Sequence, residues 1–167
     1  MPEKRTVERA RRDKREGKAP TTQAGEFVRE QIEHIREGKH GARSAAQAIA
    51  IGLSQARRAG VDLPPPEKGK ASEETRRNAK RALEAGQHPH VVSRKRSRAA
   101  TNALKRESPA AASETALARH GKAAAKERTA SERSAAARKA ARTKGPTERS
   151  QAAQKAARTR ARNKAGS

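Results

Sequence analysis

The bulky apolar residues of this chain are concentrated between positions 22 and 63, where their spacing is that of amphipathic helices. Nine of the sixteen Val, Ile, Leu, Met and Phe residues fall in this stretch, so a core is expected to form there. A first helix is predicted from four apolar residues at intervals of one, four and three, which share one helical face. They are Phe27, Val28, Ile32 and Ile35.

A second helix is predicted to begin at Ser44, which forms a capping-box pair with Gln47. Small and apolar residues line one face of it and allow the two helices to approach closely: Ala45, Ala48, Ile49, Gly52, Leu53 and Ala56. Gly38 and Gly60 each follow the last turn of a helix, as C-cap glycines do. Two helices joined by a short loop form an αα-hairpin, here predicted over residues 21–63. Its core is expected to contain Phe27, Val28, Ile32, Ile35, Ile49 and Leu53.

The rest of the chain is predicted to form arms and linkers around this hairpin. Residues 1–20 form a basic N-terminal arm whose mixed charges support a solvated helix. Residues 64–71 form a stiff Pro-rich linker. Residues 72–92 contain a third helix, capped by Ser72 and able to pack on the hairpin, followed by an irregular segment. Residues 93–167 form a basic tail rich in Ala, Arg and Lys.

The composition limits how much of the chain can fold. Leu, Ile, Val and Phe make up about 9% of the 167 residues, and a share below ~20% with high net charge is typical of disordered chains. Such a chain buries too little apolar surface to offset the entropy lost on ordering most of its backbone. The predicted fold is therefore mainly α, with a small αα-hairpin module and long, largely disordered or transiently helical basic arms.

The basic tail contains a tandem repeat with a period of sixteen residues. Residues 129–144 read TASERSAAARKAARTK, and residues 145–160 read GPTERSQAAQKAARTR. Alanine is the best helix former, Thr129 and Glu132 make a capping box, and Gly145-Pro146 breaks the pattern between the repeats. Each repeat is therefore predicted to form a short helix that has no core, is marginal alone and becomes helical on a polyanion.

The charge of the chain indicates a polyanionic partner. The net charge is +23, and residues 93–167 hold 21 basic and only 5 acidic side chains, a pattern typical of interaction tails. Because Phe27 is the only aromatic residue, base stacking is disfavoured, and the backbone of duplex DNA or of structured RNA is the expected target. The candidate phosphate contacts in the tail are Arg94, Lys95, Arg96, Arg98, Arg138, Lys139, Arg142, Lys144, Arg149, Lys155, Arg158, Arg160, Arg162 and Lys164.

The loop of the hairpin has two interpretations. Gly38-Lys39-His40-Gly41 has the GxxG pattern with which KH domains clamp a nucleic-acid backbone. No β-run flanks the two helices, however, so a helix C-cap followed by a turn glycine is favoured. Lys39 and Arg43 remain candidate phosphate contacts near the start of the second helix.

The hairpin also has the order of elements of a helix-turn-helix, in which the second helix reads bases. That helix is rich in Ala and Ile and has few side chains able to read bases. A hairpin that packs on itself or forms a homodimer is therefore favoured, since nine bulky apolar residues are few for a monomer.

No motif in the chain indicates catalysis. There is no Walker loop, dinucleotide-binding glycine motif or nucleophile elbow, so neither enzymatic activity nor a cofactor is expected. His88 and His90 have a spacing that suits metal ligation but no third ligand nearby, so no metal site is expected. The absence of Cys fits a reducing cytoplasm. No secretory signal, membrane span or apolar face for membrane insertion is expected.

Two segments resemble known proteins. The segment GEFVREQIEHIREGKHGARSAAQAIAIGLSQARRAGVDLPPP, within residues 22–66, resembles an uncharacterised bacterial family whose members are often labelled plasmid stabilisation protein, with a shared core like residues 47–54. That resemblance covers about a quarter of the chain and implies an association with DNA. The tail sequences RSAAARKAARTKG and RSQAAQKAARTR look like the Ala/Lys-rich tails of linker histones and bacterial histone-like proteins.

Three functions are compatible with these patterns. The favoured one is a non-enzymatic, nucleoid-associated DNA-binding protein that neutralises phosphates without reading sequence. The second is an RNA- or ribosome-associated basic protein, which composition does not separate from the first. The third is a plasmid-maintenance or antitoxin-like protein-interaction module, in which the tail serves solubility alone.

Overall fold

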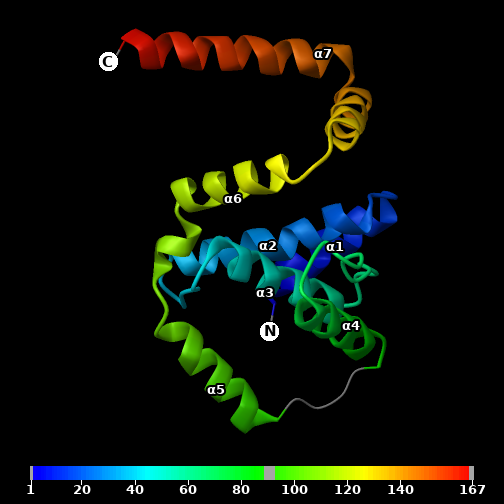
Figure 1. Ribbon diagram of the computed structural model, residues 1–167, viewed down its shortest axis with the longest axis vertical. Coiled ribbons are helices and arrows are strands. Elements are labelled where there is room, and N and C mark those ends of the chain that lie inside the picture. The colour runs from blue at the N-terminus through cyan, green and yellow to red at the C-terminus, as the bar shows by residue number, and fades with distance from the viewer. Residues whose placement is uncertain (1, 89–92, 166–167) are drawn as a thin grey trace. The chain divides into compact units, whose positions relative to one another are not determined.

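The structure is a computed structural model that describes residues 2–88 and 93–165, and its named elements are all helices (Figure 1). The prediction of a mainly α protein is therefore confirmed. By contacts between residues, the chain divides into two compact units, residues 1–120 and 121–167. The elements are α1 (Lys4–Arg15), α2 (Pro20–Arg36), α3 (Ala45–Arg58), α4 (Glu73–Gln87), α5 (Arg94–Lys105), the 3-10 helix η1 (Pro109–Ala112), α6 (Glu114–Lys126) and α7 (Ala130–Ala165).

Helices α2 and α3 form the centre of the first unit, and Gly52 allows them to lie close together. A Cβ atom at Gly52 would stand 2.6 Å from the Cα atom of Val28, so a larger residue has no space there. Ser44 caps the start of α3 as predicted, since its hydroxyl accepts the backbone N–H of Gln47 at 3.2 Å. The side chain of Gln47 accepts the N–H of Arg43 at 2.7 Å, one residue before the position expected for a capping box. The two predicted central helices are therefore present and packed together.

These two helices do not form a separate hairpin module, because other segments complete their core. Phe27 is fully buried in a cluster that also receives Ala10 from α1 and both Val61 and Leu63 from the segment after α3. Helix α4 packs along α3, with Ala79 and Ala82 buried. The core is therefore shared by α1, α2, α3, α4 and the chain between them.

The N-terminal arm is a helix, as its mixed charges predicted, but it packs on α2 instead of being solvated on all sides. Thr6, Ala10 and Asp13 of α1 are buried at spacings of four and three, so they share one helical face. Asp13 is satisfied by Lys18, whose Nζ donates to its carboxylate at 2.8 Å. The packing of this helix was not predicted because Thr and Ala give a weak apolar signal, although they pack closely when a partner surface is present.

Part of the basic tail also belongs to the core of the first unit, contrary to the expected disorder. Ala111 and Ala112 of η1 are buried in a second cluster with Ile32, Ile35, Ala42 and Ala48. The backbone N–H of Gly41 donates to the carbonyl of Leu104 at 2.9 Å, and Arg36 Nε donates to the carbonyl of Ala112 at 2.9 Å. The sequence concealed this docking because alanines dominate the whole tail, and spacing does not distinguish the buried ones.

The tandem repeat forms α7, with a break at the predicted position. Gly145 has a φ of 66°, outside the helical range, and Pro146 follows it, so α7 consists of two helices joined at the boundary between the repeats. The predicted capping box is also present. The backbone N–H of Glu132 donates to Thr129 Oγ1 at 3.2 Å, and Glu132 Oε2 accepts the backbone N–H of Thr129 at 2.7 Å. The tail is therefore helical in the structure, rather than disordered.

None of the helices among residues 2–88 and 93–165 has the length and apolar character needed to cross a membrane.

Candidate nucleic-acid interface

The first cluster of candidate phosphate contacts lies at the start of α5. Arg94, Lys95, Arg96 and Arg98 are all exposed, and none of the twelve residues of this helix is acidic. Ser93, which precedes them, makes no side-chain capping hydrogen bond. Cations at a helix N-terminus are repelled by the positive end of the helix dipole, so this placement destabilises the helix and favours an anionic partner.

The second and larger cluster lies along α7. Eleven basic residues stand on this helix against two acidic ones, Glu132 and Glu148. Glu132 belongs to the capping box, and Glu148 lies in the first turn after the break, where a negative charge complements the helix dipole. Both acids therefore have a structural reason to be at helix starts, and they balance little of the basic charge.

The candidate contacts on α7 are spread over several faces of the helix, and three of them form a stripe on one face. Lys155, Arg158 and Arg162 follow at spacings of three and four, so they share a face, whereas Arg160 lies on the opposite side. Within α7, the described candidates are exposed: Arg138, Lys139, Arg142, Arg149, Lys155, Arg158, Arg160 and Arg162. The side chains of Lys144 and Lys164 lie outside the described part of the structure. The described cations of α7 therefore lie on several sides of the helix.

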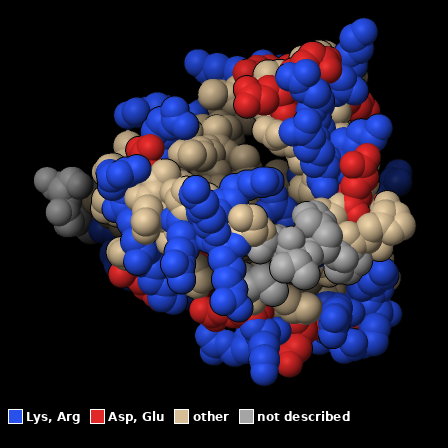
Figure 2. Space-filling model, turned by 90° about the horizontal axis from the view of Figure 1, so that it is seen from below, with Lys and Arg blue, Asp and Glu red and all other residues tan. Residues whose placement is uncertain are grey.

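The first unit differs because many of its cations have acidic neighbours. Arg9 Nε lies 2.8 Å from Glu26 Oε2, and Arg76 donates to Glu73 at 2.9 Å. Figure 2 shows Lys and Arg side chains over much of one face of the molecule, with acidic side chains set among them. Charge in the first unit is therefore partly neutralised within the fold.

The end of the loop between α2 and α3 is covered by the chain itself, which opposes a KH-type clamp at Gly41. The N–H groups of Gly41 and Ala42 are used by the carbonyls of Leu104 and Ser108. A Cβ atom at Gly41 would stand 1.9 Å from the carbonyl oxygen of Glu107. Gly38 has a φ of 73° and donates its N–H to Ile35 at 3.1 Å, which is the favoured C-cap arrangement.

The two candidate phosphate contacts of this loop both have acidic neighbours. Lys39 Nζ lies 2.9 Å from Glu37 and 3.7 Å from Glu3, and hydrogen bonding to Glu37 raises the pKa of Lys39. Arg43 Nε lies 3.8 Å from Glu107. These two cations are therefore weaker candidates than the α5 and α7 groups, because phosphate competes with a carboxylate at each of them.

Helix α3 exposes few side chains that could read bases, in line with the sequence argument against a helix-turn-helix. Its exposed residues are Ala46, Ala50 and Arg58, and its other described side chains are buried or half-buried.

Among the expected core residues, Phe27, Ile32 and Ile35 are buried. The remaining three, Val28, Ile49 and Leu53, are half-buried.

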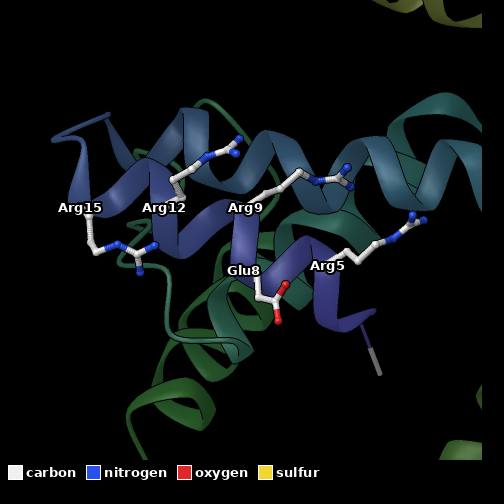
Figure 3. Close-up of a pocket in the computed structure, with 5 residues that line it drawn as sticks. All are labelled: Arg5, Glu8, Arg9, Arg12 and Arg15. Carbon is white, nitrogen blue, oxygen red and sulfur yellow. The ribbon is translucent and has the colours of Figure 1, made fainter.

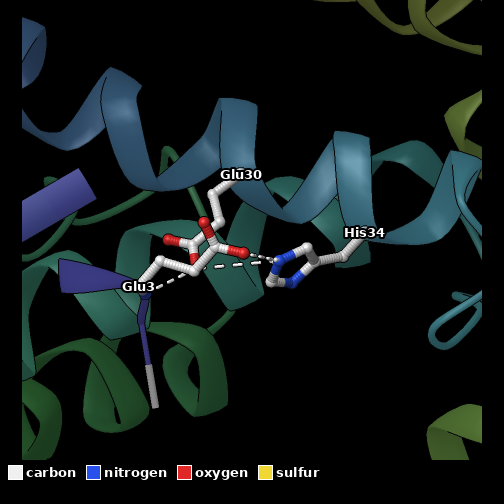
Figure 4. A group of neighbouring side chains, drawn as sticks. All are labelled: Glu3, Glu30 and His34. Atoms are coloured by element: carbon white, nitrogen blue, oxygen red, sulfur yellow. Dashed lines mark hydrogen bonds and ion pairs between the residues drawn. The ribbon is translucent and has the colours of Figure 1, made fainter. Parts of the chain in front are cut away.

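One cluster of titratable groups consists of Glu3, Glu30 and His34 (Figure 4). Each residue offers one potential ligand atom, and these three atoms lie within 4.8 Å of one another. Glu30 is only 3% exposed, and its Oε1 accepts the backbone N–H of Glu3 at 2.8 Å. His34 Nε2 lies 3.1 Å from Glu3 Oε1, and this hydrogen bond, together with the charge of Lys39, lowers the pKa of Glu3. These contacts join the start of α1 to the middle of α2, and that structural role accounts for the arrangement.

Sequence reasoning predicted a basic arm over residues 1–20 but named no candidate phosphate contact on α1. Seven of its twelve residues are Lys or Arg, and its buried residues all lie on the opposite side of the helix. The spacing of Thr6, Ala10 and Asp13 was the available signal, because small or short residues at intervals of four and three mark a helical face that can pack. The sequence alone does not show that this face has a partner.

Comparison of the chain with protein-family models, with curated proteins and with solved structures gives no match. The two resemblances noted in the sequence therefore remain predictions.

Proposed function

We propose that this protein is a non-enzymatic DNA-binding protein of the nucleoid-associated kind, which neutralises duplex phosphates with α5 and α7 without reading base sequence. The observation that carries the proposal is α7, where eleven basic residues stand against two acidic ones on a helix whose described side chains are almost all exposed. None of the described side chains of α7 is buried in a core, so the free energy that orders this helix is gained from a polyanion.

The residue types on α7 support contact with the phosphate backbone of a nucleic acid. Lys and Arg make phosphate contacts whatever the base sequence, and Arg, which is frequent on α7, forms bidentate contacts with phosphate oxygens. If about ten phosphates are neutralised, affinity is expected to fall about 10⁵-fold between about 50 and 200 mM salt. Base stacking has no platform on α7, which contains no aromatic residue.

The test compares two full-length variants with equal charge loss. The α7 variant carries Lys155→Gln, Arg158→Gln and Arg162→Gln, which removes the basic stripe. The α4 control carries Arg77→Gln, Lys80→Gln and Arg81→Gln, three exposed cations on a helix whose charges nearly balance. Binding to duplex DNA is measured by fluorescence anisotropy over a salt series.

The α7 variant should lose about 2.7 from the slope of log affinity against log salt, since each phosphate contact contributes about 0.9. The α4 control should keep the slope of the unchanged protein. Equal losses in both variants would show that net charge alone governs binding, against the proposal. Tighter binding of structured RNA than of duplex DNA by tenfold or more would favour the RNA-associated function, and unchanged affinity in the α7 variant would favour the protein-interaction module.

A further inference from the structure

We infer that the exposed face of α1 is a second binding surface for duplex phosphates, and that one chain therefore bridges two duplexes. The partner class, duplex nucleic acid, rests on the proposed function. The bridging activity goes beyond it, because it needs a further surface, on α1, in addition to the proposed contacts of α5 and α7.

The charge of α1 is concentrated on the side away from α2. Its buried residues are Thr6, Ala10 and Asp13, and the exposed residues of the helix are basic except Glu8. Asp13, the other acid of α1, is buried and bonded to Lys18. The exposed residues of this helix are Lys4, Arg5, Glu8, Arg11, Arg12, Lys14 and Arg15.

Four arginines and one acid line a shallow, open hollow along the helix (Figure 3): Arg5, Glu8, Arg9, Arg12 and Arg15. The side chains of Arg5, Arg9 and Arg12 extend to the same side of α1 in this view, whereas those of Glu8 and Arg15 point to the other side. From Arg5 to Arg15 the helix rises about 15 Å. Phosphates of one B-DNA strand follow about every 3.4 Å along the axis, so this face spans roughly four of them.

The surface is held in place before any partner arrives. Ala10 packs in the cluster around Phe27, and the backbone N–H of Glu3 donates to Glu30 at 2.8 Å. Arg9 Nε lies 2.8 Å from Glu26 Oε2, an ion pair between the edge of the face and α2. A cationic surface on a packed helix pays little ordering entropy on binding, in contrast to a helix without tertiary contacts.

The chemistry of the face selects phosphates over an inserted lipid surface. Val7 is the one bulky apolar residue of α1, and it packs against the core cluster around Phe27. An interfacial membrane helix needs large apolar side chains opposite its cations, and here that side is occupied by α2. The ion pairs on the exposed face are long: Arg5 lies 3.7 Å from Glu3 and Arg12 lies 3.8 Å from Glu16. Such exposed pairs contribute little, so phosphate displaces the carboxylates readily.

Bridging is measured by capture of a second duplex. A duplex fixed to beads is incubated with full-length protein and then with a free labelled duplex, and the retained label is counted. The α1 variant carries Arg5→Gln, Arg12→Gln and Arg15→Gln, and the control is the α4 variant with Arg77→Gln, Lys80→Gln and Arg81→Gln. A third protein carries Arg5→Lys, Arg12→Lys and Arg15→Lys, which keeps the charge of the α1 surface without arginine. Thermal unfolding of each variant confirms that the fold is kept.

The α1 variant should capture about tenfold less of the second duplex, because three phosphate contacts are lost at one of the two surfaces. The α1 variant should still bind a single duplex through α5 and α7. The α4 control and the protein with the three Arg→Lys substitutions in α1 should both bridge two duplexes as the unchanged chain does. Undiminished capture by the α1 variant, while it binds a single duplex, would overturn the bridging inference and leave the proposed function standing. If the unchanged chain binds no duplex at low salt, the proposed function itself fails. Binding of anionic vesicles without capture of a second duplex would also overturn the inference.

Discussion

The backbone N–H of Gly41 donates a hydrogen bond to the carbonyl of Leu104 at 2.9 Å, so the loop between α2 and α3 is joined to the first part of the basic tail. The contact is close because Gly41 has no side chain: a Cβ atom there would stand 1.9 Å from the carbonyl oxygen of Glu107. This contact makes η1 part of the first unit. The basic tail therefore contains a docked part, which includes η1, and a second part, α7, which belongs to the other unit.

Replacement of Gly41 by Ala should therefore undock the segment around η1. Backbone atoms have to move to admit the methyl group, and we expect a loss of about 1–3 kcal/mol in the free energy of unfolding. Chemical denaturation gives the stability, and limited proteolysis within residues 104–112 reports the docking. Gly25→Ala is the matched control, because a Cβ at Gly25 meets nothing within 4 Å and the residue lies in α2. That control should gain up to about 1 kcal/mol.

If Gly41→Ala is as stable and as resistant to protease as Gly25→Ala, the docking of η1 on the loop is wrong.

Replacement of Gly52 by Ala should disrupt the contact between α2 and α3. A Cβ atom at Gly52 would stand 2.6 Å from the Cα atom of Val28, so the two backbones have to separate. We expect destabilisation of about 1–3 kcal/mol, measured by urea denaturation. Because this contact lies at the centre of the unit, the whole transition should shift to lower denaturant, without selective loss of η1. An unchanged midpoint would contradict the close packing of these helices.

The stability of the first unit should fall on acidification through Glu3. The hydrogen bond to His34 lowers the pKa of Glu3 below its usual 4.5. A carboxyl whose pKa is lower in the folded state stabilises that state above its unfolded pKa and loses this contribution as the pH falls through the folded pKa. The difference in Tm between the unchanged protein and Glu3→Gln should therefore be present at neutral pH and shrink below about 4.5.

A double-mutant cycle with His34→Ala checks the cause of this pH dependence. With His34 removed, the further effect of Glu3→Gln on Tm at neutral pH should be smaller, because the main interaction that lowers the pKa is gone. Equal effects in both backgrounds would show that Glu3 does not act through His34.

The break in α7 should depend on Gly145 and Pro146. Gly145 has a φ of 66°, which residues with a side chain adopt at a steric cost, and Pro146 lacks the N–H that a continuous helix needs. The double substitution Gly145→Ala, Pro146→Ala should therefore raise the helical signal in circular dichroism. Gly121→Ala in α6 is the control for the intrinsic gain from removing a helical glycine, since a Cβ there meets nothing within 4 Å. A gain no greater than that of the control would contradict a real break between the repeats.

The features that could be predicted from the sequence are those with a strong local signal. The spacing from Phe27 to Ile35 predicted α2, because bulky apolar residues on one face of a helix need burial. Ser44 and Thr129 predicted helix starts, because a hydroxyl at an N-cap satisfies a backbone N–H that the helix leaves unpaired. Gly145-Pro146 predicted the break in α7, because this pair cannot continue a helix.

Only the tertiary structure decided which small residues became core. Ala10 and Ala112 are both buried, yet the chain contains many alanines that are exposed, such as those along α7. Alanine gains little from burial, so its environment depends on whether a complementary surface, here α2 and α3, is close enough to exclude water. The same dependence placed the cations of α1 on a fixed surface, whereas their number and the identity of each residue were determined by the sequence alone.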